Sequence, residues 1–301
     1  MRPAQTWTTH FSQEVPLMRT RRIGDVEVSA IGLGGMPLSI EGRPDRERAL
    51  ATVRAAVEAG VTLIDTADAY SFDDQDFGHN EELIAEALRG LGSAADGVFV
   101  ATKGGHTRVA GGGWGLNGSP DYLRSACDAS LKRLGVEAID LYQFHRPDPT
   151  VPLADSFGTI GELLDAGKIK QAGISNFNPD EIRQANEVLG GRLAAVQNQF
   201  SPSYRSSEPE LELCAEMGIA FLPWSPLGGI GKAGALAERG TAFAEIAEAH
   251  GASPQQVCLA WMLAKAPVVI PIPGASRPES IRSSAEATHV ELTADELARL
   301  D

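Results

Sequence analysis

The chain has 301 residues, of which 43% are hydrophobic and 22% are charged, and these values are ordinary for a globular protein. Its formal net charge of −14 argues against a nucleic-acid partner and against an anionic membrane surface, because both contacts need a basic protein surface. The charge does not exclude a small anion bound in a locally basic pocket.

Three cysteines, Cys127, Cys214 and Cys258, lie far apart in the sequence and have no CxxC spacing. An odd number of cysteines in this arrangement argues against a disulfide framework and against a zinc site. We therefore expect a reducing, cytoplasmic location and no bound metal. No apolar run approaches the ~18 residues that are needed to span a membrane.

The N-terminal segment lacks the apolar stretch of a secretory signal. We expect residues 1–20 to form a disordered leader and residues 21–301 to form a single domain. Met18 is an alternative natural start, so the sequence leaves open whether residues 1–17 belong to the natural protein.

The predicted elements begin with a short hairpin, because residues 21–36 alternate apolar and polar side chains around Gly24-Asp25. A first strand of the main sheet follows at Ile31 to Gly35. Helices and strands then alternate, with helices expected at 45–59, 79–90, 119–134, 152–166, 178–189, 207–217, 253–265 and 278–287, and strands at 61–65, Val98 to Thr102, Ile139 to Phe144, Gln171 to Ser175, Ala194 to Gln197, Ile219 to Trp224 and Val268 to Ile272. Three helix starts, at Ser119-Pro120, Asn178-Pro179 and Ser253-Pro254, place a capping side chain before a proline.

Eight short, apolar strands separated by helices predict a parallel sheet in an α/β fold. Eight such units fit a (β/α)8 TIM barrel that carries a short N-terminal β-hairpin. The alternative is an open doubly wound sheet, which usually has GxGxxG after its first strand, and GLGGMP at 32–37 lacks that spacing. Two stretches have no role in the alternation, the glycine-rich loop 104–118 and the segment 228–243.

In such a barrel the active site forms where the strands end. Residues 61–70 read VTLIDTADAY, so Asp65 ends a buried strand and Tyr70 follows it. Lys103 and His145 end two later strands. Each residue taken alone is better explained by a turn, a helix cap or a structural role. Together they place an acid, a phenol, an amine and an imidazole at one mouth.

These four side chains suit protonation of a carbonyl oxygen. The ordinary pKa of tyrosine is near 10, and a neighbouring ammonium such as Lys103 lowers it. Asp65 would keep Lys103 charged and in place, while His145 would donate a hydrogen bond to the substrate oxygen or assist proton transfer. None of the four can donate a hydride, so a cofactor must supply it.

The motifs DTADAY, ATKGG, YQFHRPDP, GISNF, QNQFSP, WSPLG and IPGASRPE resemble, in order and spacing, the aldo-keto reductases over residues 21–301. The PLGG segment and the short chain are most similar to bacterial members of the pyridoxal-reductase type. The resemblance implies a (β/α)8 barrel, NAD(P)H bound without a Rossmann fold, and reduction of a carbonyl group. It implies a catalytic tetrad of Asp65, Tyr70, Lys103 and His145.

The resemblance also implies which residues bind the cofactor. The carboxamide of the nicotinamide would contact Ser175, Asn176 and Gln197, and its ring would stack on Trp224. The remaining expected cofactor contacts are Gly35 and Met36 at the edge of the nicotinamide site, Ser225, Pro226, Leu227 and Gly228 along the pyrophosphate, and Gly274, Ser276, Arg277, Ser280 and Ser284 around the adenosine 2′-phosphate.

A basic side chain beside the expected 2′-phosphate favours NADPH over NADH. The sequence departs from many relatives at Ser280, Ser283 and Ser284, where Gln, Glu and Asn are common, and Arg282 is a compensating cation. Gly35-Met36 replaces a more usual Gly-Thr pair.

The expected substrate is a small carbonyl compound, and its contacts would come from the loops. The candidates are Met36, Phe72, His106, Trp114, Arg146 and Ile230, and Trp114 is either a lid over the substrate or part of a surface loop. Two other functions stay open, a non-catalytic NADP-binding regulatory subunit and, less favoured, a Schiff-base aldolase that uses Lys103. The physiological substrate, the direction of reaction and the oligomeric state stay undetermined.

Overall fold

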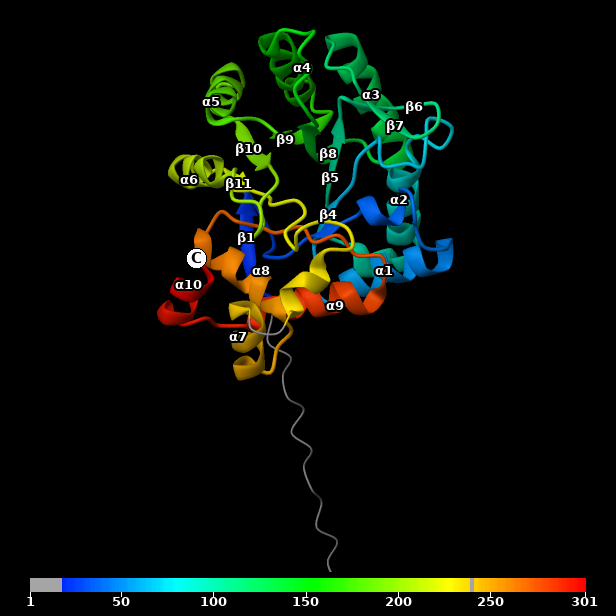
Figure 1. Ribbon diagram of the computed structural model, residues 1–301. Helices are drawn as coiled ribbons and strands as arrows, with labels where there is room; N and C mark the ends of the chain where they lie inside the picture. The colour runs from blue at the N-terminus through cyan, green and yellow to red at the C-terminus, as the bar shows by residue number, and fades with distance from the viewer. Residues whose placement is uncertain (1–17, 239–240) are drawn as a thin grey trace, which may run out of the picture.

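The computed structural model describes residues 18–238 and 241–301 (Figure 1). Residues 1–17 of the expected leader lie outside this range, whereas Thr20 already pairs with Ser29 in a hairpin. Among the helices in the described ranges, none combines the length and apolar composition that crossing a bilayer requires.

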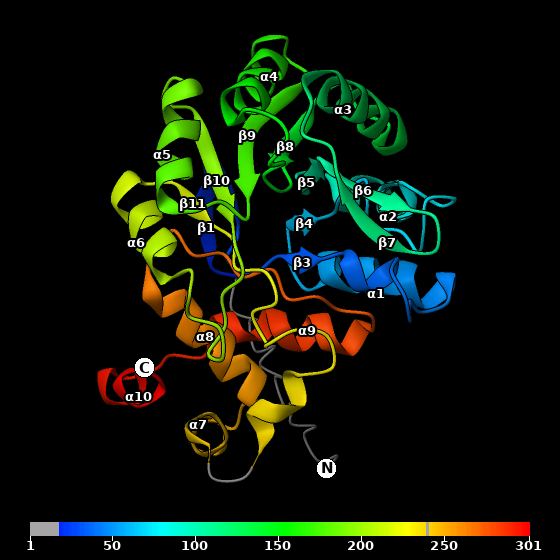
Figure 2. The ribbon, with the colours of Figure 1, turned by 45° about the horizontal axis from the view of Figure 1, so that its top comes forward.

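The central feature is a curled parallel sheet surrounded by helices (Figures 1 and 2). Its seven strands in the described residues are, in spatial order, β11 (Ala220–Phe221), β10 (Leu193–Gln197), β9 (Ile169–Ser175), β8 (Ile139–Phe144), β5 (Phe99–Gly104), β4 (Leu63–Asp65) and β3 (Leu33–Gly34). Neighbouring strands run parallel and the connecting segments contain helices, so the predicted alternation of strand and helix is confirmed. All carboxyl ends of the strands therefore meet at one end of the sheet.

The helices lie close to their expected bounds. They are α1 (Arg46–Glu58), α2 (His79–Leu91), α3 (Pro120–Leu134), α4 (Leu153–Asp165), α5 (Pro179–Val188), α6 (Glu208–Met217), α8 (Pro254–Lys265) and α9 (Pro278–Glu286). The caps predicted at Ser119, Asn178 and Ser253 are present, and each side chain accepts a hydrogen bond from a backbone N–H of the first turn. These bonds satisfy donors that have no partner inside the helix.

The prediction of a strand at Val268 to Ile272 is wrong, because this segment does not form a regular strand. The segment instead connects both edges of the sheet: Ile270 N donates to Phe221 O at 2.9 Å on one side, and Gly34 N donates to Pro273 O at 3.0 Å on the other. Pro271 and Pro273 explain the irregularity, because proline has no N–H to donate to β3 and cannot sustain a regular ladder.

The N-terminal hairpin is confirmed. Strands β1 (Thr20–Ile23) and β2 (Val26–Ser29) pair antiparallel around Gly24, whose φ of 57° is left-handed. Ile23 and Val28 are buried in one cluster with Leu63 and Phe99, which lie at the amino ends of their strands. The hairpin therefore covers the end of the sheet opposite to the carboxyl ends.

Several elements were not expected from the sequence. The glycine-rich loop 104–118 contains a second hairpin of β6 (His106–Val109) and β7 (Gly113–Leu116), and the chain also forms α7 (Ala242–His250) and α10 (Ala294–Leu300). The described residues also form short 3-10 helices, which are η1 (Met36–Leu38), η2 (Gly92–Ala95), η3 (Ala233–Ala237) and η4 (Ala287–His289). The β6–β7 hairpin is hard to predict from the sequence, because its glycines have low strand propensity. Gly111 and Gly112 adopt the positive φ that the turn of the hairpin needs.

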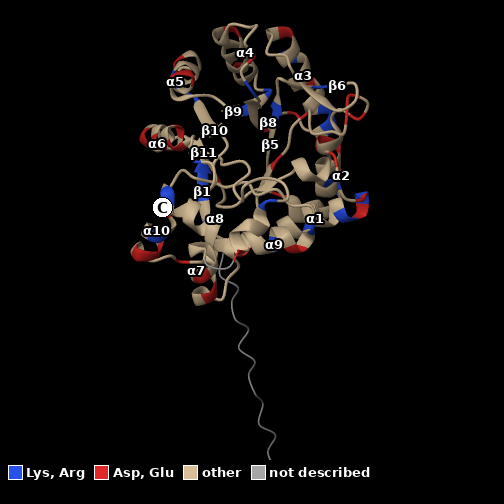
Figure 3. Cartoon of the chain, viewed as in Figure 1, with Lys and Arg blue, Asp and Glu red and all other residues tan. Residues whose placement is uncertain are grey.

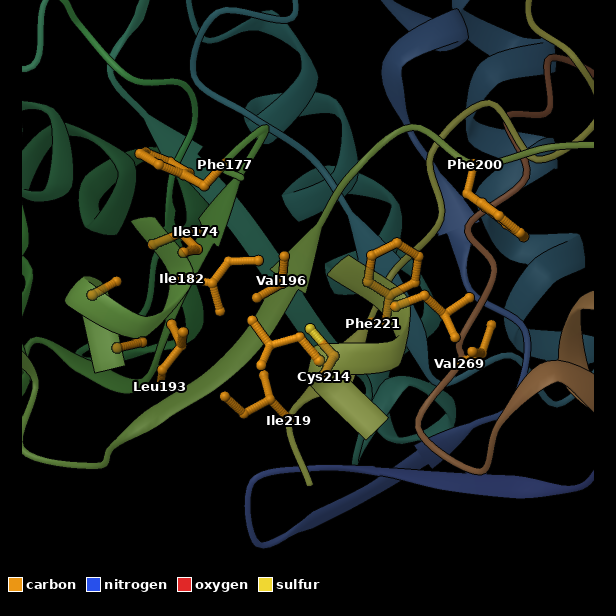
Figure 4. Close-up of a cluster of buried hydrophobic side chains, with 14 of the residues drawn as sticks. Ile174, Phe177, Ile182, Leu193, Val196, Phe200, Cys214, Ile219, Phe221 and Val269 are labelled. Carbon is orange, nitrogen blue, oxygen red and sulfur yellow. The ribbon is translucent and has the colours of Figure 1, made fainter. Parts of the chain in front are cut away.

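Large apolar side chains fill the space between the sheet and the outer helices, as Figure 4 shows for the region around Ile174, Phe177 and Phe221. Phe157 on α4 is fully buried there, and its ring centroid lies 5.4 Å from that of Phe177 and 6.3 Å from that of Phe144. The three rings join α4 to strand β8 and to the loop that follows β9.

We expect Phe157→Ala to lower the free energy of unfolding by about 3 to 5 kcal/mol, because it removes a buried ring and leaves a cavity. Urea unfolding followed by circular dichroism measures the change. Val188→Ala is the matched control, since Val188 is 39% exposed, and it should change the value by less than about 1 kcal/mol. A loss below 1 kcal/mol for Phe157→Ala would contradict the packing described here.

Candidate active site

A cavity of about 860 Å³ opens at the carboxyl ends of the parallel strands. Its wall includes the last residues of three strands, Asp65, Ser175 and Gln197, together with His145 and Trp224 from the loops that follow β8 and β11. The volume lies within the range of about 300–1,000 Å³ that is typical of small-molecule sites. The described residues contain no group of three or more His, Cys, Asp or Glu side chains placed to hold a metal ion.

Lys103 lies at the centre of the site and its side chain is fully buried. Its ammonium group donates to Asp65 Oδ2 at 2.7 Å, to the Thr66 carbonyl at 2.8 Å and to Tyr70 Oη at 3.0 Å. All three ammonium protons therefore have acceptors. Burial lowers the pKa of Lys103, but the charge of Asp65 and the contact with Tyr70 outweigh burial and raise it. Lys103 is consequently a cation at neutral pH.

The strand register brings Asp65 and Lys103 to the same face of the sheet. Asp65 is opposite Ala101 in the β4–β5 pair, so Lys103, two residues further along β5, points the same way. Lys103 is in turn opposite Gln143 of β8. Gln143 Nε2 donates to Asp65 Oδ1 at 3.4 Å and Gln197 Nε2 donates to the same oxygen at 2.8 Å.

Gln143 is a site residue that the sequence analysis missed. A glutamine in the apolar strand IDLYQF, two residues before His145, was the available signal, because a polar side chain inside a strand that is buried on both faces needs a partner. Gln197 was expected to contact a nicotinamide carboxamide. The structure shows that its amide N–H also orients Asp65.

Tyr70 is buried, with 6% of its surface exposed at the cavity. Burial raises its pKa more than the Lys103 charge lowers it, and Asp65 raises it further. The expected lowering of the Tyr70 pKa by the Lys103 charge is present, but desolvation of the phenolate is the larger effect, so the pKa as a whole is raised. Tyr70 is a neutral phenol at neutral pH and can act as a proton donor.

His145 is a neutral imidazole. Burial first, and then the charge of Lys103, hold its pKa well below the usual range. Its ring lies edge-on to Tyr70, with centroids 5.7 Å apart, and stacks on His106 at 4.5 Å. Within the described residues its Nδ1 has no hydrogen-bond partner. A neutral imidazole beside the phenol can donate one hydrogen bond to a substrate oxygen, which suits orientation better than proton donation.

The two acids of the DTADAY stretch have opposite environments. Asp65 accepts hydrogen bonds on both oxygens, from Lys103 on one and from glutamine side chains on the other. Asp68 is fully buried and neither of its oxygens has a partner among the described residues. Burial, and then the charge of Glu81, raise the pKa of Asp68 well above its usual range, so this carboxyl is neutral. Among the residues that the structure describes, Asp65 is the acid that pairs with Lys103.

The cavity wall also carries amide, hydroxyl and indole groups, from Asn176, Ser175 and Trp224. Ser175 Oγ donates to the Gln197 carbonyl at 2.7 Å, and Asn176 Nδ2 donates to the His145 carbonyl at 3.0 Å. Trp224 Nε1 donates to Asn176 Oδ1 at 3.1 Å and fixes the indole plane in the cavity wall. Asn176 and Ser225 have φ of 67° and 51°, a strained conformation that clusters at ligand sites.

The other expected site residues divide into two groups. The cavity wall includes Met36, His106, Trp114, Arg146, Ser225, Pro226, Leu227, Gly274 and Ser276. The wall does not include Gly35, Phe72, Gly228, Arg277, Ser280 or Ser284. The Phe72 side chain is 48% exposed, and its carbonyl accepts a hydrogen bond from Arg108. Arg282, expected to serve the adenosine end, forms an ion pair with Glu58 at 3.0 Å.

The sequence analysis did not identify a further part of the wall, because these residues lie outside the helices and strands that the sequence predicted. They are Pro37, Ile40 and Glu41 before α1, Gly115 and Leu116 on β7, and Gly229, Gly231 and Ala233 in the segment 228–243. Ile230, a candidate from the sequence, also lines the cavity. Both stretches that had no role in the predicted alternation thus contribute to the wall.

Comparison with known proteins agrees with this geometry. A model of the Aldo/keto reductase family matches residues 30–301. The chain belongs to the aldo/keto reductase family. Membership makes the protein an oxidoreductase that acts on carbonyl or alcohol groups, and it confirms the resemblance seen in the sequence motifs.

Three relatives illustrate the match. The chain is 35% identical to an uncharacterized oxidoreductase of Schizosaccharomyces pombe over 94% of its own length and 89% of that protein. It is 34% identical to a 6-dehydroglucose reductase of Novosphingobium aromaticivorans, over 91% of each chain. A crystal structure of an aldo/keto reductase from Klebsiella pneumoniae, in complex with NADP and acetate, superposes with a TM-score of 0.78 at 28% identity and covers 95% of each chain.

Burial of His106 in the cavity wall makes the stability of the protein depend on pH. Burial first, and then the charges of Arg146, Lys103 and Arg108, lower the pKa of His106 to about 4. The unfolded chain takes up this proton near pH 6.5 and the folded chain only near pH 4, so stability is present above pH 6.5 and is lost as the pH falls to about 4.

We expect His106→Asn to reduce the loss of stability between pH 6.5 and pH 4 by on the order of 2 to 3 kcal/mol. Urea unfolding at a series of pH values gives the two curves. His289→Asn, at an exposed position, is the control and should follow the wild type. Parallel curves for His106→Asn and wild type would show that His106 titrates normally in the folded protein.

Proposed function

We propose that the protein is an NADPH-dependent reductase that converts an aldehyde or a ketone to an alcohol, with Tyr70 as general acid. The observation that supports this most strongly is the buried Lys103 ammonium, which donates hydrogen bonds to Asp65 and to the Tyr70 hydroxyl at the wall of the cavity. We also propose that the chain adopts the (β/α)8 barrel of its family, with the segment 268–273 in place of a regular eighth strand.

The wall formed by Ser175, Asn176 and Trp224 fits a nicotinamide nucleotide. Trp224 offers an indole face that is partly exposed in the cavity and fixed by its bond to Asn176. Gly229 has a φ of 110°, and a side chain placed there would meet nothing within 4 Å, which leaves space for phosphate groups against the backbone. When bound, the nucleotide supplies the hydride.

The side chains around Lys103 account for the proton. Tyr70 donates its phenol proton to the carbonyl oxygen, and its O–H bond breaks as the new O–H bond forms. The Lys103 ammonium, 3.0 Å from the phenol oxygen, stabilises the phenolate that remains. His145 donates a hydrogen bond to the same substrate oxygen and orients it. Asp65 compensates the Lys103 charge, so the cation persists in a buried place.

We propose a preference for NADPH over NADH from the residues after the segment 268–273. Gly274 and Ser276 line the cavity, and Arg277 is the exposed residue that precedes α9. In the described parts of the chain Arg277 forms no ion pair, so its guanidinium is available for a 2′-phosphate at the amino end of the helix. Ser280 and Ser284 lie on the first turns of α9.

The two other functions have less support. A Schiff-base aldolase needs a neutral lysine, and the three hydrogen bonds and raised pKa of Lys103 keep it protonated. A non-catalytic NADP-binding subunit is compatible with the same geometry. It predicts nucleotide binding without turnover, which the next experiment separates from a reductase.

We expect Tyr70→Phe to bind NADPH as the wild type does and to lose at least about 100-fold in kcat for an aldehyde, because the general acid is removed. Tyrosine at position 204, which is 40% exposed, gives the control variant Tyr204→Phe. Wild-type turnover in Tyr70→Phe would refute the assigned acid. NADPH binding by the wild type without turnover on a broad aldehyde panel, including pyridoxal, would favour the regulatory subunit.

We expect Arg277→Ala to weaken NADPH binding by about 10-fold to 100-fold and NADH binding by less than about 3-fold, because only NADPH carries the 2′-phosphate. Titration with each nucleotide, followed by quenching of tryptophan fluorescence, measures both affinities, since Trp224 lies in the expected nicotinamide site. Arg183→Ala on the exposed face of α5 controls for a general loss of positive charge. An equal effect on both nucleotides would exclude a contact with the 2′-phosphate, and no binding of either would refute the proposed cofactor.

A further inference from the structure

Arg146 is a charged group of the cavity wall to which the proposed reaction assigns no partner. It directly follows His145 in the loop after β8 and lines the cavity. Its Nε is buried, and among the described residues that atom has no hydrogen-bond partner. The guanidinium keeps its charge at any physiological pH, so a buried N–H of this group is costly unless an acceptor arrives.

The two carboxylates of the cavity wall already form ion pairs with basic side chains other than Arg146. Asp65 pairs with Lys103 at 2.7 Å, and Glu41 pairs with Arg108 at 2.8 Å. Asp148, the acid closest to Arg146 in sequence, accepts hydrogen bonds from Gly118 N and from Thr150 instead. Within the described residues Arg146 therefore has no acidic partner.

The overall charge of the protein makes this cation unusual. The net charge is −14, and Figure 3 shows acidic positions (red) on the outer helices, among them α5, α6, α7 and α10. The cavity wall contains only the two paired acids, Asp65 and Glu41, among the residues that the structure describes. A positive group without a partner in a partly desolvated cavity attracts an anion more strongly than it would in water.

Arg146 directly follows His145, whose ring lies edge-on to that of Tyr70 with centroids 5.7 Å apart. Its charge acts on both His106 and His145, which stack on each other at 4.5 Å. His106 belongs to the β6–β7 hairpin, which Figures 1 and 2 show beside β5, whereas Ser225 to Gly231 belong to the segment after β11. An anion bound by Arg146 in the cavity therefore lies next to His145 and His106, near the proposed general acid.

The β6–β7 hairpin gives this side of the cavity a defined wall. The Arg108 guanidinium stacks on the Trp114 ring at 4.1 Å and bonds Glu41 and the Phe72 carbonyl, so three loops are tied together. Trp114 in turn contacts His106, with ring centroids 5.2 Å apart. Indole, imidazole and guanidinium groups thus surround the space next to the tetrad. An apolar or aromatic body with one anionic end fits this combination.

We infer that Arg146 binds an anionic group of the substrate, and that the preferred substrates are aldehydes or ketones that carry a carboxylate or a phosphate. This inference rests on the proposed reductase function, since it places the carbonyl group at Tyr70 and the anion at Arg146. A carboxylate and a phosphate both suit the planar donor fork of arginine.

Matched substrate pairs test the inference. The first pair is 4-carboxybenzaldehyde and 4-methylbenzaldehyde, and the second is glyceraldehyde 3-phosphate and glyceraldehyde. We expect Arg146→Gln to lower kcat/KM for the charged member of at least one pair by about 10-fold to 100-fold, and for its neutral member by less than about 3-fold. The pair that responds identifies the anion as a carboxylate or a phosphate. Arg146→Lys should restore part of the loss, and Arg183→Gln should match the wild type.

Two outcomes overturn the inference while leaving the reductase function intact. Equal losses for charged and neutral members would show that Arg146 only supports the cavity wall. Unchanged kcat/KM for both charged members would show that it contacts no substrate anion.

Failure of the proposed function has a different signature. If the wild type reduces none of the four compounds with either nucleotide, the reductase proposal fails, and binding decides the role of Arg146. The probes are then 4-carboxybenzyl alcohol and 4-methylbenzyl alcohol, with affinity measured by tryptophan fluorescence. Weaker binding of only the carboxylate by Arg146→Gln supports the anion site, and equal affinities in wild type and variant overturn it.

Discussion

The site is organised around one buried charge, the Lys103 ammonium. Removing such an ion from water costs several kcal/mol, and a protein tolerates it only when nearby groups replace the lost hydration. Here a carboxylate, a carbonyl and a phenol each accept one of its three protons. The geometry of Asp65 and Tyr70 follows from that requirement, because a shift of either would leave a buried N–H without an acceptor.

The hydrogen bonds that hold Lys103 continue through Asp65 to other strands of the sheet. Asp65 is held by Gln197 and Gln143 from two other strands, so the ion pair joins β4, β5, β8 and β10. Gly173 makes room for this arrangement, because a Cβ at that position would lie 2.8 Å from Cγ of Gln143. Parallel strands with this register place the polar groups in one layer at the carboxyl ends.

The same burial that makes Lys103 dependent on its neighbours determines which groups hold protons. Desolvation keeps Tyr70 as a phenol and His145 and Asp68 as neutral groups, while pairing with Asp65 keeps Lys103 charged. A single charged pair next to neutral donors is the distribution that protonation of a carbonyl oxygen requires. Arg146 then stands out as the charge in the wall that this arrangement does not balance.

Much of the fold could be predicted from the sequence by itself. The order of helices and strands, three capping residues and the polar residues at the strand ends follow from local patterns, since periodicity, caps and strand ends depend on neighbouring residues. The catalytic roles of Asp65, Tyr70, Lys103 and His145 stay a proposal. Four features could not be predicted in this way. They are the β6–β7 hairpin, the hydrogen bonds of residues 268–273 to both edges of the sheet, the hydrogen bond from Gln143 to Asp65, and the raised pKa of Tyr70. They depend on contacts between residues far apart in the chain and on the loss of water around them, and only the tertiary structure decides both.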